Sequence, residues 1–169
     1  MRPVWPAHKK LPSRRALVAV FIGLLASACD PSLGPSRAVG VALSVPGGQP
    51  EIRVVLCPGE RVTRVEFVEE RGGVVGDKDD TRLWQIVAPN GSTADSFIAG
   101  VVPADFRQTV PFAQPLPTNQ SLAAIVQIIR RPSMFVVFHA LDLRPDRVWS
   151  VDGVVKPEAF EGKARTRCR

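Results

Sequence analysis

The stretch VTRVEFV, residues Val62–Val68, decides the fold class because its apolar and polar residues alternate. Alternation with a period of two is typical of a β-strand that buries one face and exposes the other. Val65 and Phe67 fall on the same side of such a strand, so both are expected in the core. The outward face and the end of this strand are expected to carry its acidic residues, Glu66, Glu69 and Glu70.

Seven further apolar runs, most of them bounded by turn residues, accompany this strand. They are Val39–Val45, Ile52–Cys57, Leu83–Ala88, Phe97–Val102, Leu122–Ile129, Met134–Leu141 and Val148–Val151. Short runs that recur about every ten residues are typical of all-β sandwiches and barrels. We therefore predict an all-β fold, an antiparallel two-sheet sandwich of immunoglobulin-like type, with an open barrel as the second choice.

Two segments fit the strand pattern less simply. Leu122–Ile129 is a continuous apolar run, which suits either a buried strand or a turn of helix. Residues 103–120 contain four prolines, and proline cannot donate a ladder hydrogen bond. This second segment is expected to be a long crossing loop or to form proline-broken edge strands.

The distribution of charge argues against a nucleic-acid partner. The chain has a formal net charge of +6, but residues 1–28 contain five basic residues and no acidic one. The remainder therefore holds seventeen basic residues and all sixteen acidic ones, and is close to neutral. Phosphate binding needs a basic footprint, which this remainder lacks.

The first 28 residues have the three-part layout of a secretory signal peptide. Met1–Arg15 is basic, Ala16–Ala26 is apolar and uncharged, and the small residues Ser27 and Ala28 follow. The apolar run is shorter than the roughly 20 residues that span a bilayer. We expect a cleaved signal peptide at residues 1–28, with an uncleaved membrane anchor as the alternative.

The end of this segment resembles the lipobox of bacterial lipoproteins. Ala26-Ser27-Ala28-Cys29 follows Leu24-Leu25, and in that family a cysteine after small residues is joined to a diacylglyceryl group. The resemblance implies that Cys29 carries the lipid, with acyl chains such as palmitate, and is the first residue of the mature protein. Because two acyl chains give stable attachment, the expected location is the cell membrane, on its extracytoplasmic face.

Alternatives remain for processing and export. Cleavage after Ala28 by the ordinary signal peptidase would give a secreted protein without lipid. Ser13-Arg14-Arg15-Ala16-Leu17 also resembles a twin-arginine motif, so the general and twin-arginine routes both stay open.

The mature chain is expected to begin with a tether. Residues 29–38, which start with the lipidated cysteine, are rich in Pro, Ser and Gly and are expected to form it. Residues 39–169 are expected to form a single β-sandwich domain.

The three cysteines are expected to have two different roles, lipid attachment and disulfide formation. If Cys29 carries lipid, Cys57 and Cys168 remain, and an even remainder in an exported protein favours a disulfide. Such a bond would close a loop of roughly 110 residues and contribute up to about 4–5 kcal/mol in the chain-entropy model. It would also hold down the segment Gly162–Arg169. Two unpaired thiols are the alternative.

No motif in the chain specifies a reaction. His139, the only histidine beyond the signal peptide, lies in an apolar run and is expected to be a packed residue with one hydrogen bond. A hydrolase would need a serine and an acid beside it, yet no serine lies in a Gly-x-Ser-x-Gly pattern. The acidic stretch Asp77-Lys78-Asp79-Asp80 offers calcium ligands, but a solvated hairpin tip explains it better. We therefore predict no catalytic residue, no metal site and no cofactor.

Two surface features complete the pattern. The tail residues Lys163, Arg165, Arg167 and Arg169 alternate, which would place them on one side of an extended segment. Such a row suits a solvated edge that discourages aggregation, or contact with anionic lipids or wall polymers. Of Trp84 and Trp149, one is expected in the core, and the other is a candidate for a sugar- or peptide-binding face.

Together these features predict a non-enzymatic interaction or structural module of the bacterial cell envelope. Its expected partners are the membrane, through the lipid, and an envelope protein or polymer that the sequence does not identify. One alternative is a small envelope hydrolase that uses His139. The other is a surface module that binds a small ligand or a metal.

Overall fold

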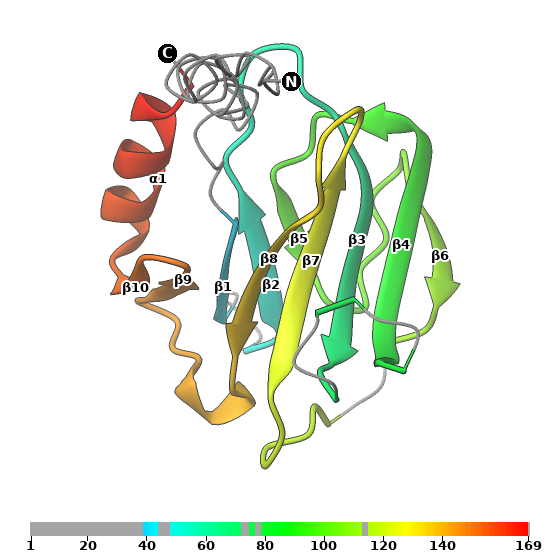
Figure 1. The fold of residues 1–169 in the computed structure, drawn as a ribbon, viewed down its shortest axis with the longest axis vertical. Helices are drawn as coiled ribbons and strands as arrows, with labels where there is room; N and C mark the ends of the chain where they lie inside the picture. Colours follow the sequence, from blue (N-terminus) through cyan, green and yellow to red (C-terminus); the bar gives the residue numbers. More distant parts are fainter. Residues whose placement is uncertain (1–38, 44–47, 72–74, 77–78, 113–114, 169) are drawn as a thin grey trace, which may run out of the picture. The chain divides into compact units, whose positions relative to one another are not determined.

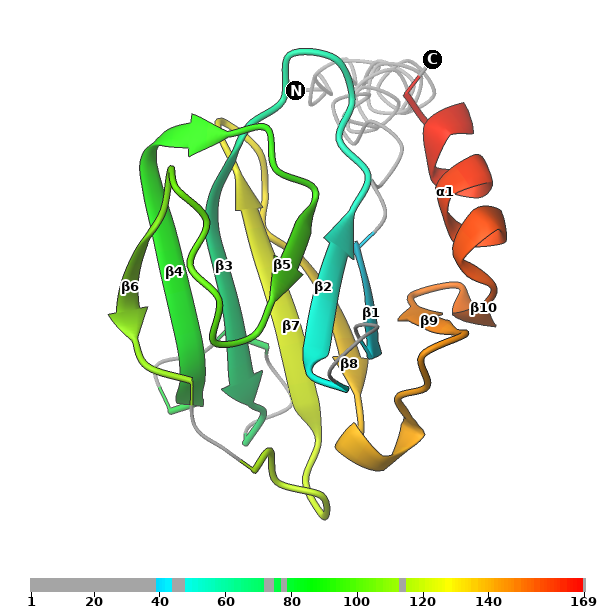
Figure 2. The same ribbon diagram turned by 180° about the vertical axis from the view of Figure 1, so that it is seen from behind.

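The computed structural model describes residues 39–43, 48–71, 75–76, 79–112 and 115–168. Within them, two five-stranded antiparallel sheets form a sandwich, as predicted (Figure 1). Seen from behind, β2 and β5 lie in front of β3 and β7, so the two layers are distinct (Figure 2). The predicted signal peptide, Cys29 and the tether lie outside the described residues.

The two sheets are defined by their strand order. Sheet A has the order β10-β9-β1-β2-β5, and its strands are β1 (Val39–Leu43), β2 (Pro50–Val54), β5 (Ser96–Ile98), β9 (Val148–Ser150) and β10 (Gly153–Val155). Sheet B has the order β6-β4-β3-β7-β8, and its strands are β3 (Val62–Glu69), β4 (Thr81–Ser92), β6 (Arg107–Val110), β7 (Leu122–Ile128) and β8 (Met134–Phe138). Two helices are also present in the described part, the 3-10 helix η1 (Ala140–Asp142) and the α-helix α1 (Pro157–Thr166).

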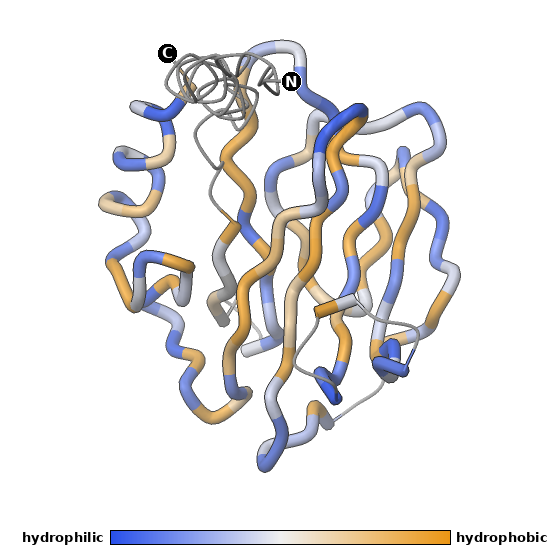
Figure 3. The backbone as a smooth tube through the Cα atoms, viewed as in Figure 1, coloured by the Kyte–Doolittle hydropathy of each residue, from blue (hydrophilic) through white to orange (hydrophobic). Residues whose placement is uncertain are grey.

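The stretch VTRVEFV becomes β3, the central strand of sheet B. It pairs with β4 on one side and β7 on the other, and Phe67 lies opposite Trp84 and Ala124. Phe67 and Trp84 are fully buried, with ring centroids 5.7 Å apart. Phe138 packs edge-on against Phe67, so aromatic rings from three strands of sheet B fill the space between the sheets. Hydrophobic residues accordingly follow β7 and β8 in Figure 3.

Several strands differ in extent from the predicted runs, and β4 differs most. The run Leu83–Ala88 was expected to stop at Pro89, but β4 continues to Ser92. Pro89 is tolerated because it falls where the register between β3 and β4 shifts, so the ladder needs no hydrogen bond from it. The ambiguous run at Leu122 is strand β7 rather than a helix, and the proline-rich segment supplies the edge strand β6.

The prediction of an extended basic tail was wrong, because the tail forms α1. Pro157 occupies the first turn, where proline is favoured, and Phe160 and Ala164 lie one turn apart on the buried face. This spacing forms an apolar stripe that an extended chain could not present. Lys163 and Arg165 therefore lie on a helix that packs against the sandwich.

The glutamates expected on the outward face and at the end of β3 are more enclosed than surface residues usually are. Glu66 and Glu69 are buried, although Glu66 does point away from the space between the sheets, as expected. The Glu66 carboxylate is covered by the guanidinium groups of Arg64 and Arg82, each at 3.3 Å. Its nearest hydrogen bond comes from Gln85 Nε2 at 2.6 Å. Burial is tolerated because both carboxylate oxygens are paired.

Candidate functional site

Helix α1 creates the most distinctive local feature of the described chain, because it covers only part of the outer face of sheet A. Phe160 and Ala164 pack on Val148 and Ala42 in a small second core. Gly40, which lies in β1 under this helix, has no room for a side chain. A Cβ atom there would collide with Val148 and press on the ring of Phe160.

An ion-pair cluster fixes one side of α1. Asp152, in the turn between β9 and β10, lies 3.2 Å from Lys163 Nζ and 2.9 Å from Arg167 Nη2. The hydrogen bond from Lys163, reinforced by Arg167, lowers the pKa of the Asp152 carboxyl below its usual value. The two cations are four residues apart, which places them on the same side of the helix.

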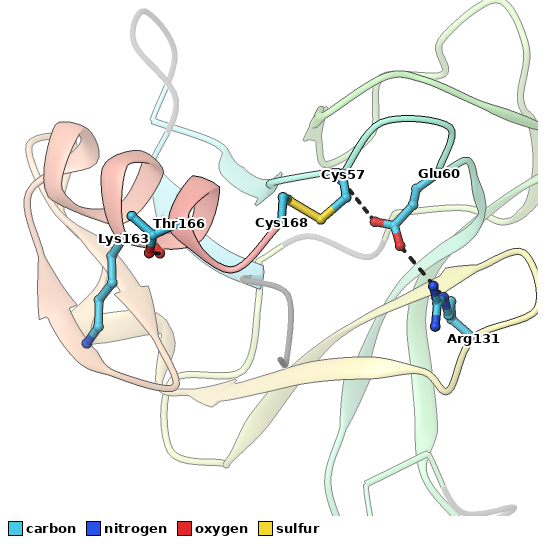
Figure 4. The surroundings of a disulfide bond; sticks show 6 residues. All are labelled: Cys57, Glu60, Arg131, Lys163, Thr166 and Cys168. Carbon is cyan, nitrogen blue, oxygen red and sulfur yellow. Dashed lines mark hydrogen bonds and ion pairs between the residues drawn. A yellow bond between two sulfur atoms is a disulfide. The ribbon is translucent and has the colours of Figure 1, made fainter. Parts of the chain in front are cut away.

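A disulfide fixes the end of α1. Cys57 and Cys168 are joined with an S–S distance of 2.05 Å, in agreement with the pairing predicted from the sequence (Figure 4). Beside it, the Glu60 carboxylate accepts a hydrogen bond of 3.0 Å from the Cys57 amide and lies 3.8 Å from Arg131 Nε. The disulfide therefore ties the helix to the segment between β2 and β3, and Arg131 ties that segment to the loop after β7.

A cleft of about 530 Å³ lies between α1 and the part of sheet A that the helix leaves uncovered. Its lining comes from β2, from the segment that follows β2, from the start of β5 and the residues before it, and from α1. These residues are Glu51, Arg53, Val54, Val55, Leu56, Pro58, Thr93, Asp95, Ser96, Phe160, Glu161, Arg165 and Cys168. The cleft thus combines charged, hydroxyl and apolar groups.

Strand register explains why polar groups form the sheet side of the cleft. Glu51 and Arg53 are two residues apart on β2, so both side chains point to the outer face. Ser96 of β5 lies directly opposite Arg53. The Glu51 carboxylate accepts hydrogen bonds from Ser96 Oγ at 2.6 Å and from Arg53 Nη2 at 3.1 Å. These contacts hold all three side chains in fixed positions.

The charges in the cleft are not fully balanced. Glu51 pairs with Arg53, and Glu161 on α1 lies 3.6 Å from Arg165. Asp95 is exposed, and its side chain makes no ion pair or hydrogen bond with any described residue. The lining therefore carries one uncompensated negative charge, next to the hydroxyl groups of Thr93 and Ser96.

His139 was expected to be packed, and this expectation was wrong. The residue is exposed, because it follows the end of β8 and precedes η1. The predicted single hydrogen bond does occur, with Nδ1 at 3.1 Å from the Gln120 carbonyl oxygen. Among the described residues, no serine or acidic side chain forms a hydrogen bond or ion pair with this imidazole.

The two tryptophans and the acidic stretch singled out in the sequence contribute to the packing and hydrogen bonding of the fold. Trp84 is the buried core tryptophan, and half-buried Trp149 donates a hydrogen bond of 2.7 Å to the Val137 carbonyl, which links the two sheets. In the acidic stretch, Asp77 and Lys78 lie outside the described residues. Asp80 is buried, not solvated, because it accepts hydrogen bonds from the amides of Arg71 and Gly76 in the β3–β4 connection. Across the part of the chain that the structure describes, no group of three or more His, Cys, Asp or Glu residues could hold a metal ion.

Sequence reasoning missed the cleft because it missed the helix. The pattern PEAFEGKART does contain signals for a helix, namely proline at its first position and apolar residues one turn apart. The pair Glu51 and Arg53 could have been placed on one face of a strand from their spacing. Only the three-dimensional fold brings Thr93, Asp95 and Ser96 beside them.

Comparisons with known proteins do not extend this description. At a level that indicates relationship, the sequence matches no family model, no curated protein and no solved structure. Among the described residues, no helix has the length and apolar character needed to cross a bilayer. The fold and the site therefore define the class of protein, a two-sheet β-sandwich with a helix-bordered cleft.

Proposed function

We propose that this protein is an exported, lipid-anchored β-sandwich of the bacterial envelope that binds a partner in the α1 cleft without catalysing a reaction. The lipobox-like residues before Cys29 support the anchor. The Cys57–Cys168 disulfide supports an extracytoplasmic location, because disulfides persist outside the reducing cytosol.

The observation that carries the binding role is the way the cleft is built. Binding sites are concave and largely preformed, with a few polar groups fixed among apolar ones. Here Glu51 is fixed by Arg53 and Ser96, and α1 is fastened by the disulfide and by Asp152. A cleft with rigid sides loses little entropy when a ligand enters, which favours binding.

The anchor is tested by the intact mass of the unreduced protein from the membrane fraction of its host. We expect a mass that lacks residues 1–28, is raised by a diacylglyceryl group and is lowered by two hydrogens for the disulfide. A lipid-free protein in the growth medium would contradict the anchor and leave the binding role to be judged separately.

The binding role is tested by NMR titration of the isotopically labelled full mature protein. Three classes of small fragment serve as probes: alkyl amines, alkyl carboxylates and neutral sugars. We expect at least one class to shift the amide resonances of the cleft lining and to leave those of β8 unchanged. Recovery of the fragments unaltered after prolonged incubation is expected for a non-enzymatic module. If no class shifts the cleft resonances at millimolar concentration, or if a fragment is chemically converted, this proposal is wrong.

A further inference from the structure

We infer that the α1 cleft takes a primary ammonium group at the end of an alkyl chain, as in the lysine side chain of a peptide. This inference rests on the proposed binding role and names the chemistry of the ligand. It combines three observations: the unpaired charge of the lining, the hydroxyl groups beside it, and the apolar surface within the same cleft.

The charge of the lining favours a cation. Both arginines of the cleft already have carboxylate partners, Arg53 with Glu51 at 3.1 Å and Arg165 with Glu161 at 3.6 Å. Asp95 has no such partner among the described residues. An incoming ammonium would complete the one missing pair. An incoming carboxylate would be repelled by Asp95 and would approach two guanidinium groups whose charge is already balanced by neighbouring carboxylates.

The hydroxyl groups beside Asp95 suit the geometry of an ammonium. A primary ammonium has three N–H donors and no acceptor. Thr93, Asp95 and Ser96 each carry a side-chain oxygen, and all three line the cleft from one short segment. Because Ser96 uses its hydroxyl proton on Glu51, its oxygen is left as an acceptor.

This segment is held in place before any ligand arrives. The Asp95 carbonyl accepts a hydrogen bond of 2.8 Å from the Val54 amide of β2. The Ser92 hydroxyl accepts one of 3.2 Å from the Ala94 amide. With Ser96 bound to Glu51, three consecutive residues are anchored, so the acceptors need little rearrangement to bind.

The apolar part of the lining accounts for the alkyl chain. Leu56, Pro58 and Phe160 line the same cleft as Asp95. Long cationic side chains bury their methylene stems on apolar surface while the charged head meets polar groups. A bare ammonium ion would leave this surface unused, and a purely apolar ligand would leave Asp95 unpaired.

The test compares two probes that differ by the terminal ammonium group. Nα-acetyl-lysine methylamide and Nα-acetyl-norleucine methylamide have similar alkyl stems, but only the side chain of the first ends in an ammonium. In NMR titrations of the oxidised mature protein, we expect the lysine probe to shift the amides of residues 93–96 and 160–165. We expect it to bind at least about fivefold more tightly than the norleucine probe, the size of one exposed ion pair. Equal binding of the two probes, or tighter binding of N-acetyl-glutamate methylamide, would overturn the inference.

A pair of variants locates the effect. Asp95→Asn is expected to remove the preference for the lysine probe. Asp146→Asn is the matched control, since Asp146 is highly exposed, pairs with Arg147 and does not line the cleft. The control is expected to bind the lysine probe as the unmodified protein does, and both variants are expected to unfold at the same denaturant concentration.

The outcomes separate this inference from the proposed function. If carboxylates or sugars shift the cleft resonances and the lysine probe does not, the binding role stands and the ammonium assignment is wrong. If none of the probe classes shifts them, both fail. Retention of the lysine preference in Asp95→Asn would also contradict the assignment, because the charge that carries it would be absent.

Discussion

Each sheet of the sandwich has a buried glutamate on its outer face, Glu51 in sheet A and Glu66 in sheet B, and their surroundings differ. Glu66 is contacted by Arg64, Arg82 and Gln85, which all belong to sheet B itself. Glu51 is contacted by one arginine and one serine, and it faces the cleft beside α1.

The difference lies in what covers each carboxylate. The sheet B side chains close over Glu66, and Gln85 is itself held by Thr109 Oγ1 at 2.7 Å. Over sheet A, the helix covers the apolar half of the face and leaves the polar half open. Both glutamates are carboxylates held by neighbouring donors. Glu66 thus stabilises sheet B, whereas Glu51 contributes to a candidate binding site on sheet A.

The largest effect on stability is expected from releasing helix α1, which covers part of sheet A. Cys57→Ser combined with Cys168→Ser removes the disulfide, which spans 111 residues of sequence. We expect a loss of about 4 kcal/mol from the free energy of unfolding, because the unfolded chain regains the freedom that the cross-link removes. Denaturant titration measures this loss.

Hydrogen exchange in the same double variant tests the comparison of the two faces. Amides of α1 are expected to lose protection before those of β3, because the cysteine bond fastens the helix and not sheet B. Loss of protection in β3 first, or unchanged stability, would show that the cover of sheet A does not depend on this bond.

A steric change under the helix comes next. Gly40→Ala places a methyl group against Val148 and Phe160, and overpacking of this kind is expected to cost about 2–3 kcal/mol. The matched control is Gly162→Ala in α1, where a Cβ would meet no atom within 4 Å. This control is expected to stabilise the protein by about 0.5–1 kcal/mol, because alanine favours a helix more than glycine does. Thermal unfolding of both variants checks the opposite signs, and equal destabilisation would contradict the packing argument.

Removing each glutamate then compares the two carboxylates directly. Glu66→Ala is expected to cost about 2 kcal/mol, since it leaves two guanidinium groups and an amide without their shared partner. Glu51→Ala is expected to cost about 1 kcal/mol, because water in the cleft can replace part of the lost contact for Arg53. Denaturant midpoints measure both, and a larger cost at Glu51 would mean that the cleft is closed to solvent.

The sequence predicted the sandwich well because strands are defined by a local period. Residues of VTRVEFV alternate, and sheet pairing follows from that alternation once turns are placed. The disulfide could also be predicted, since pairing two remaining cysteines needs only a count and a compartment.

The candidate site was not predictable in the same way. Asp95 and Arg165 are 70 residues apart in sequence, and their shared cleft depends on where α1 packs. The burial of Glu66 likewise depends on side chains from the neighbouring strand, which a pattern read along one strand does not contain. Periodicity indicates which face a residue occupies, but not what lies above that face.

The smallest expected effect concerns the ion pairs that hold α1 on the side away from the cleft. A carboxyl whose pKa is lower in the folded than in the unfolded state stabilises the fold above its unfolded pKa, about 3.9 for aspartate. Asp152 is such a group, because Lys163 and Arg167 lower its pKa. Its contribution is therefore present at neutral pH and is lost as the pH falls through the lower folded pKa. Asp152→Asn is expected to flatten the fall in melting temperature between about pH 5 and pH 2 slightly, since the variant has no carboxyl to protonate. Asp146→Asn should retain the full dependence, and an unchanged profile in Asp152→Asn would mean that the disulfide and the apolar face hold α1 without help from these charges.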